Sequence, residues 1–250
     1  ITSTPTIHFQ SKPRFVKFLP STSTANSKEL KMATKKAILT KDKIVSMYMN
    51  YTLEQNEKPK SVYQFSKLNG FTESEFYTFF GTLNSIENEI FNMFLEKTVA
   101  LLEKDANYET YDMKSKMLSF YFTFFELLSA NRSYVVMSLK ENENHLKNLM
   151  QLSTLRKSFK EYVAGIISDE YRIKQEKLQS FQEKTIKETS WLQLLMTLKF
   201  WLDDSSPAFE KTDIYIEKSV KATFELMNIA PIDSIIDFGK FLFKEKTQSK

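Results

Sequence analysis

Residues 60–86 read KSVYQFSKLNGFTESEFYTFFGTLNSI, and the organisation of the whole chain follows from this stretch. Val62, Phe65 and Leu68 recur at helical spacing, which predicts a short helix with one apolar face. Gly70 ends this helix, because glycine readily adopts the left-handed conformation found just after a helix C-terminus.

A second short helix is predicted directly after the glycine. Thr72 is placed to cap it, and Glu75 follows three residues later, which is the spacing of a capping box. Phe76, Phe79 and Phe80 would pack this second helix back against the first. Two short helices around a tight turn are typical of a helix-turn-helix.

The stretch resembles the DNA-binding half of the TetR family of transcriptional regulators. Asn56 stands where that family usually has a glycine, and asparagine is the next-best residue for a positive φ. The resemblance implies an all-α chain with an N-terminal three-helix helix-turn-helix bundle and a larger C-terminal helical bundle. The matching positions are Ser61-Val62, Gly70-Phe71-Thr72, Phe76-Tyr77, Phe80, Thr82 and Ile86.

Composition independently favours an all-helical fold. The 250 residues include only four glycines and six prolines, whereas sheets need frequent turns. There is no cysteine and there are only two histidines, so thiolate metal sites and histidine-based catalysis have little to draw on. The glycines are isolated and form no phosphate-binding loop. We therefore expect no catalytic residues, no metal, no cofactor and no enzymatic activity.

The chain divides into three segments. Residues 1–32 are predicted to be a disordered basic tail, residues 33–86 a helix-turn-helix DNA-binding domain, and residues 87–250 a ligand-binding and dimerisation domain. Residues 1–43 carry nine Lys or Arg against two acidic residues, and in this family such a basic arm can reach DNA. No apolar run reaches transmembrane length, and we expect a cytoplasmic protein.

The resemblance implies that the second short helix reads the major groove of a double-stranded operator, while hydroxyl and cationic side chains contact phosphates. Against this, residues 44–100 hold four Lys and seven Glu, and Glu73 lies on the recognition helix itself. Leu83 replaces the lysine that the family sets against phosphate, and Phe79 replaces its usual histidine or tyrosine. The candidate DNA-binding residues are Lys43, Lys60, Ser61, Thr72, Ser74, Tyr77 and Thr82.

The C-terminal half is predicted to consist of amphipathic helices over residues 86–104, 112–130, 134–150, 152–167, 169–188, 191–202, 213–229 and 231–243. In TetR proteins this half binds hydrophobic small molecules between its helices, and candidates to line such a pocket are Phe120, Tyr121, Phe124, Phe125, Tyr134 and Met137. The same residues also suit a plain core, which aromatic stripes at helical spacing more often form. The resemblance implies a homodimer formed through the last long helices. Candidate interface residues, which also suit the core of a single chain, are Trp191, Leu195, Trp201, Phe224 and Met227.

Two functions remain open. The first is a TetR-like, ligand-responsive homodimer that regulates transcription by binding an operator. The alternative is a TetR-folded protein that binds a lipid or a protein partner and no longer reads DNA. The acidic recognition helix favours the alternative, as does the apolar segment over residues 231–243, which suits a membrane surface or a partner.

Overall fold

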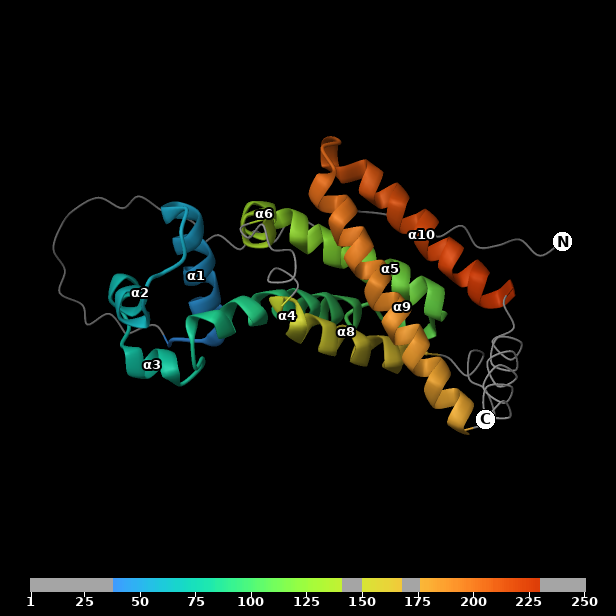
Figure 1. Cartoon of the computed structure of the whole chain (residues 1–250), viewed down its shortest axis with the longest axis horizontal. Coiled ribbons are helices and arrows are strands. Elements are labelled where there is room, and N and C mark those ends of the chain that lie inside the picture. The colour runs from blue at the N-terminus through green and yellow to red at the C-terminus, as the bar shows by residue number, and fades with distance from the viewer. Residues whose placement is uncertain (1–37, 141–149, 168–175, 230–250) are drawn as a thin grey trace, which may run out of the picture.

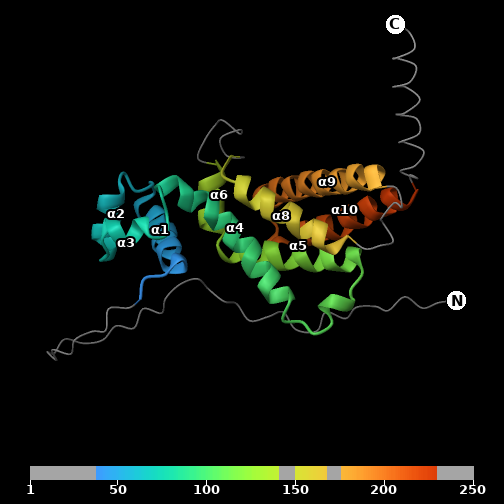
Figure 2. The ribbon, with the colours of Figure 1, turned by 90° about the horizontal axis from the view of Figure 1, so that it is seen from below.

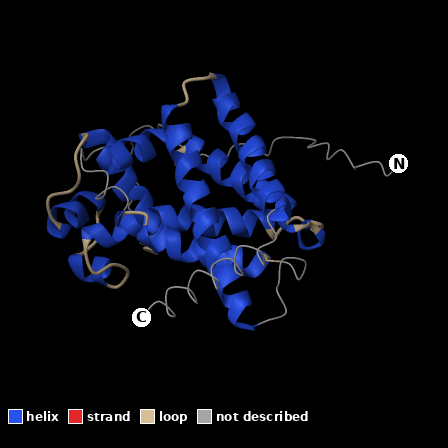
Figure 3. Ribbon diagram, turned by 45° about the vertical axis from the view of Figure 1, so that its right-hand side comes forward, coloured by secondary structure: helices blue, strands red, loops and turns tan. Residues whose placement is uncertain are grey.

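A computed structural model describes residues 38–140, 150–167 and 176–229, and every regular element in these ranges is a helix (Figures 1 and 3). The predicted all-α fold is confirmed. A small N-terminal bundle lies at one end of the molecule, and helix α4 leads from it into a larger C-terminal bundle (Figure 1). The predicted tail over residues 1–32 and the predicted helix over residues 231–243 lie outside the described residues.

The N-terminal bundle consists of α1 (Lys41–Gln55), α2 (Val62–Asn69) and α3 (Glu73–Tyr77). Each helix begins after a hydroxyl side chain that accepts a backbone N–H from its own first turn. The caps are Thr40 for α1, Ser61 for α2 and Thr72 for α3, and the predicted capping box of Thr72 with Glu75 is confirmed.

Phe65 is the centre of the N-terminal core. It is fully buried, and its ring makes edge-on contacts with the rings of Tyr48, Tyr51, Phe71 and Phe76 at centroid distances of 5.5–6.4 Å. Such aromatic pairs contribute free energy beyond the area they bury. One ring of α2 therefore holds all three helices together.

Two predictions about this core are wrong. Leu68 was expected on the apolar face of α2, but 65% of it is exposed, and Phe79 is 38% exposed instead of packing back fully. Helix α2 has only eight residues, so it buries a single turn around Phe65 and leaves Leu68 beyond the contact. Phe79 follows the end of α3, and the next residue, Phe80, is the one that packs against Phe76 and is buried.

Helix α4 (Leu83–Leu102) connects the two bundles (Figure 1). It begins three residues before the predicted start at Ile86, because Thr82 caps it. The Thr82 hydroxyl accepts the backbone N–H of Ser85 at 3.1 Å, and the Ser85 hydroxyl accepts the N–H of Thr82 at 3.2 Å. Leu83 is thus a helical residue that lies in the first turn of α4.

The C-terminal bundle consists of α5, α6, α8, α9 and α10, which pack around a continuous aromatic core. Helix α4 packs against α5 and α8, α8 packs against α9, and α10 packs against both α5 and α9 (Figure 2). Short 3₁₀ turns precede α5 and α10, at Tyr108–Thr110 and Pro207–Phe209. The helix bounds are Met113–Ala130, Arg132–Lys140, Ser153–Ile166, Glu176–Asp203 and Glu210–Ile229.

Helix α9 (Glu176–Asp203) is continuous, so the prediction of separate helices over residues 169–188 and 191–202 is wrong. Residues 189–190 between the two predicted helices are threonine and serine, which are weak helix formers. Ile186, Trp191 and Leu194 on either side of the pair are buried, and their packing outweighs this weak local preference.

The turn from α9 to α10 is held by the carboxylate of Asp204. It accepts hydrogen bonds from the backbone N–H and hydroxyl of Ser206, at 2.8 and 2.7 Å, and from those of Thr212, at 2.9 and 2.7 Å. Burial raises the pKa of Asp204, but these hydrogen bonds outweigh burial and lower its pKa to about 2.

Arg132, at the start of α6, also stabilises this turn. Its guanidinium donates to the backbone carbonyls of Trp201, Leu202 and Asp204 at 2.9, 3.2 and 3.1 Å. It also lies 4.4 Å from the ring centroids of both Trp201 and Phe209. These carbonyls lie at the C-terminus of α9, so Arg132 satisfies acceptors that the helix leaves open.

Candidate nucleic-acid interface and ligand-binding core

All seven predicted DNA-binding residues lie on the surface of the N-terminal bundle or at its junction with α4. Three of them are already engaged as helix caps, since Ser61, Thr72 and Thr82 each accept a backbone N–H. The hydroxyls of Ser74 and Tyr77 make no hydrogen bond within the described residues, and Tyr77 is 54% exposed. Ser74 and Tyr77 are therefore the hydroxyl groups of α3 that are available to a partner.

Positive charge on this surface is sparse. Lys60 lies 3.6 Å from the carboxylate of Glu57, and Lys43 donates to the carbonyl of Ile38 at 2.6 Å. Both ammonium groups are exposed, so solvent-screened contacts of this kind cost little to exchange for another anion. The predicted basic arm before α1 lies outside the described residues.

The two glutamates of α3 differ in their surroundings. The Glu75 carboxylate accepts the backbone N–H of Thr72 at 2.8 Å, so its charge is placed at the N-terminus of its own helix, where it is favourable. Glu73 is exposed and has no such partner among the described residues. Both glutamates lie in the first turn of α3, and of the two only Glu73 lacks a hydrogen-bond or ion-pair partner among the described residues.

An exposed apolar group on the same bundle was not predicted from the sequence. Tyr63 is 59% exposed, and Leu68, Tyr77 and Phe79 of the same bundle are exposed as well. The Lys67 ammonium lies 5.6 Å from the Tyr63 ring centroid. The periodicity of α2 placed Leu68 inside, and no local signal in the sequence distinguished it from Phe65.

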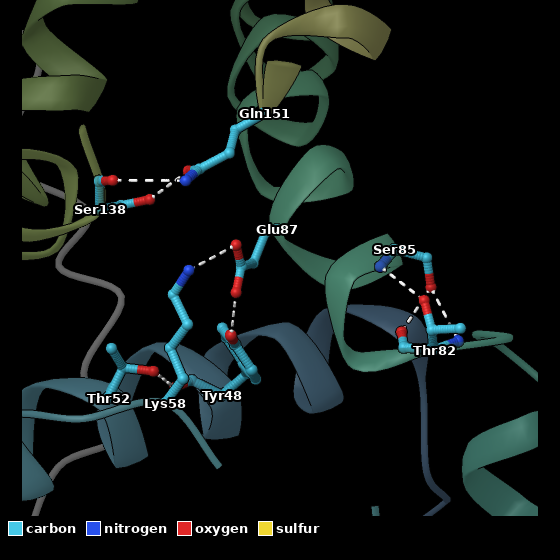
Figure 4. A network of polar contacts seen from close by, with 8 residues as sticks. All are labelled: Tyr48, Thr52, Lys58, Thr82, Ser85, Glu87, Ser138 and Gln151. Atoms are coloured by element: carbon cyan, nitrogen blue, oxygen red, sulfur yellow. Dashed lines mark hydrogen bonds and ion pairs between the residues drawn. The ribbon is translucent and has the colours of Figure 1, made fainter. Parts of the chain in front are cut away.

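A buried polar network joins the N-terminal bundle to α4, and it too was missed by sequence reasoning. The carboxylate of Glu87 accepts the hydroxyl of Tyr48 at 2.6 Å and the ammonium of Lys58 at 2.9 Å, and Glu87 is only 5% exposed. Figure 4 shows both groups approaching Glu87 from the N-terminal bundle. Nearby, Ser138 of α6 donates to the side chain of Gln151 at 2.7 Å.

The predicted pocket residues come together in the centre of the C-terminal bundle. Phe120 stacks on Phe124 at 5.4 Å and on Tyr162 at 4.8 Å, and Tyr121 stacks on Phe125 at 6.2 Å. Five of the six are buried and Met137 is half-buried, so they form a close-packed aromatic core. The buried residues are Phe120, Tyr121, Phe124, Phe125 and Tyr134.

Tyr121 is the exception within this core. It is fully buried, yet its hydroxyl has no hydrogen-bond partner among the described residues. Burial raises the pKa of Tyr121 well above its usual value, so the group is a neutral donor. A buried hydroxyl without a partner costs free energy and calls for an explanation.

The predicted interface residues lie inside a single chain. Trp201 is fully buried, Trp191 and Phe224 are nearly so, and Leu195 packs against the core. The side chain of Met227 lies outside the described residues. These residues were candidates because the resemblance implies dimerisation through the last long helices, and hydropathy alone does not separate a core position from an interface position. Among the described side chains of α9 and α10, the large apolar ones that are exposed are Leu192, Met196, Phe200, Ile214 and Leu226.

Within the described ranges, no group of His, Cys, Asp or Glu side chains is arranged to hold a metal ion. Among the same residues, no helix is both long and apolar enough to cross a bilayer.

The C-terminal half of the chain is similar to a known protein domain. A family model described as the tetracyclin repressor-like C-terminal domain matches residues 116–242, which is just over half of the 250 residues. The matched region begins within α5 and includes α6, α8, α9 and α10. No curated protein matches the chain.

Proposed function

The chain belongs to the TetR family, and on that basis we propose that it is a transcriptional regulator that binds DNA as a ligand-responsive homodimer. The observation that carries this proposal is the geometry of α2 and α3. The two helices are fixed by Ser61 and Thr72 around the buried Phe65, and they lie at one end of the molecule (Figure 1).

Contacts with phosphate would come from groups that are free or easily released. Ser74 and Tyr77 offer hydroxyl donors on α3, and Lys43 and Lys60 offer exposed ammonium groups on the same bundle. The unpaired carboxylate of Glu73 suits an acceptor for a cytosine amino group. With so few cations, the affinity for DNA should be modest and its salt dependence shallow.

Dimerisation would use the exposed apolar side chains of α9 and α10. Leu192, Met196 and Phe200 recur every four residues along α9, so they share one face of that helix. The Phe200 ring stacks on Tyr215 of α10 at 4.5 Å, which extends this face across both helices. Exposed apolar patches of this kind mark protein–protein interfaces, and a twofold pair of recognition helices requires one.

Ligand response would use the aromatic core of the C-terminal bundle. The buried hydroxyl of Tyr121 can donate a hydrogen bond but has no acceptor among the described residues, and the neighbouring Phe124 and Phe125 are apolar. The ligand class that satisfies both features is a largely hydrophobic molecule or lipid that carries one hydrogen-bond acceptor.

The alternative is a TetR-folded protein that binds a partner or lipid and has lost DNA binding. It is favoured by the exposed apolar side chains of the N-terminal bundle, Tyr63, Leu68 and Phe79, together with the unpaired Glu73. Exposed apolar side chains contribute little to a surface that contacts phosphates, whereas they are common in protein–protein interfaces.

Fluorescence anisotropy of the full chain tests the proposal. The probes are the DNA immediately upstream of its own gene and a shuffled duplex of equal composition, each titrated across a salt series. We expect tighter binding to the upstream duplex, with an affinity that falls as salt rises. Lys60→Gln and Lys43→Gln should each reduce the salt slope by about one.

The matched control is Lys104→Gln, because Lys104 is equally exposed but follows the far end of α4. It should leave both affinity and slope unchanged. Equal or absent binding to the two duplexes would overturn the regulator proposal and leave the partner-binding alternative.

A further inference from the structure

A groove lies on the surface of the C-terminal bundle between α8 and α9, which run side by side (Figure 2). Its volume is about 370 Å³, and it lies outside the aromatic core described above. Its lining includes Arg156, Lys157, Lys160 and Glu161 of α8 and Lys187 of α9. The groove is therefore lined mainly by cations.

Concentrating cations in this way opposes folding unless negative charge is supplied. Arg156 and Lys160 are four residues apart on one helical face, a spacing at which like charges repel. Lys157 adds a third positive charge from the same helix, and Lys187 adds a fourth from α9. A cluster of this kind needs counter-charge from the protein or from a bound anion.

The protein supplies part of that counter-charge through Glu188. Its carboxylate accepts from the Lys160 ammonium at 2.5 Å and from the Arg156 guanidinium at 2.9 Å. These hydrogen bonds lower the pKa of Glu188 to about 2, so it stays ionised. Glu188 thereby holds two cations in fixed positions, which reduces the entropy that a ligand would have to remove.

The remaining cations are not compensated in this way. Neither Lys157 nor Lys187 forms an ion pair with any described residue, and Arg156 uses only one of its guanidinium nitrogens on Glu188. Four cations face two carboxylates, those of Glu161 and Glu188. The groove thus keeps an excess of positive charge and unused N–H donors.

We propose that the α8–α9 groove binds a small oxyanion carrying at least two negative charges, such as a phosphate ester or a polycarboxylate. The volume is enough for such an ion and its water, and charge-assisted hydrogen bonds from Arg and Lys are the interactions that recognise it. The cations converge on a concave site formed by two helices, which favours a compact anion over an extended anionic surface.

The position of the groove gives binding a structural consequence. Helix α8 packs against α4, and in the core the ring centroids of Phe159 of α8 and Phe120 lie 5.2 Å apart. An anion bound between α8 and α9 would therefore hold α8 in place, and with it the surface against which α4 packs. Any effect of this on DNA binding depends on the proposed function above, whereas binding of the anion itself does not.

Isothermal titration of the full chain with pyrophosphate tests the site, with sodium chloride added to keep ionic strength constant. Citrate in a second arm distinguishes phosphate from polycarboxylate chemistry. We expect saturable binding of one anion per chain. Lys157→Gln and Lys187→Gln should each weaken it by about tenfold, and the double variant by more.

The matched control is Lys199→Gln, because Lys199 is exposed on the same helix as Lys187 but away from the groove. It should bind as the unchanged protein does. Lys157 and Lys199 are exposed and Lys187 is half-buried. Circular dichroism checks that each variant keeps the folded state. Absence of binding at millimolar anion, or equal weakening by Lys199→Gln, would overturn the proposal.

Discussion

The N-terminal bundle and the turn between α9 and α10 differ in how far along the chain the partners of their helix ends lie. In the N-terminal bundle, each capping group lies three residues from the amide it accepts, as in Ser61 with Gln64 and Thr72 with Glu75. At the turn, the group that satisfies the end of α9 is Arg132, about 70 residues earlier in the chain. Local partners fix single helices, whereas a distant partner fixes the arrangement of several.

The difference should appear in how stability is distributed. An exposed cap contributes roughly 1 kcal/mol and acts on one helix. Arg132 and Asp204 instead serve several partially buried groups at once, so removing either leaves acceptors or donors without partners. The chain allows the two regions to be monitored separately, because its only two tryptophans, Trp191 and Trp201, lie on α9.

The largest effect is expected from Arg132→Ala. The substitution removes three hydrogen bonds to carbonyls and two cation–π contacts, so we expect a loss of about 3 kcal/mol in the free energy of unfolding. Urea titration followed by tryptophan fluorescence measures it. Arg132→Lys should recover only a small part, since an ammonium lacks the planar fork. A loss below about 1 kcal/mol would show that the distant contact does not hold the turn.

A smaller, pH-dependent effect is expected from Asp204→Asn. The amide cannot accept all four hydrogen bonds, and we expect a loss of about 2 kcal/mol at pH 7. The folded pKa of about 2 lies below the value of roughly 3.9 for unfolded aspartate, so the ionised group stabilises the fold above about pH 4. That contribution is lost as the pH falls toward 2.

The free-energy difference between the unchanged protein and Asp204→Asn should therefore shrink as the pH falls from 4 to 2. Urea titrations at several pH values follow it. Glu217→Gln is the control, because Glu217 is exposed in the middle of α10 and should show no such trend. A difference that stays constant with pH would rule out ionised Asp204 as the stabilising group.

The same contrast explains what could be predicted from the sequence. Thr72 with Glu75, Gly70 and the aromatic positions around Phe65 were recognisable, because each depends on residues a few positions away. They were enough to identify the helix-turn-helix and the family. The all-α class followed from the scarcity of glycine and proline.

Long-range features could not be predicted in this way. Nothing near Arg132 indicates that its partners are the carbonyls at the end of α9, and nothing near Glu87 indicates that it meets Tyr48 and Lys58. Trp191 and Trp201 were candidates for an interface because the resemblance implies dimerisation through the last long helices, and local hydropathy does not distinguish an interface position from a core position. The groove at Lys157 likewise exists only because α8 and α9 lie together.

The smallest effect, and the sharpest test of local control, is Gly70→Ala. Gly70 ends α2 with φ of 74°, and no atom lies within 4 Å of an added Cβ, so the substitution meets no steric obstacle. Only the left-handed backbone is unfavourable for alanine, which should cost about 1 kcal/mol. Gly81→Ala is the matched control, since its added Cβ is equally unobstructed and its φ is not left-handed.

The effect of Gly70→Ala should be confined to the N-terminal bundle. Urea titration followed by circular dichroism should detect the loss, whereas the tryptophan fluorescence of α9 should change little if the two bundles unfold independently. Equal losses by both probes would mean that the buried Glu87 network couples the bundles into one cooperative unit. Equal stability of the Gly70→Ala and Gly81→Ala variants would contradict the assignment of Gly70 as the residue that ends α2 by its own conformation.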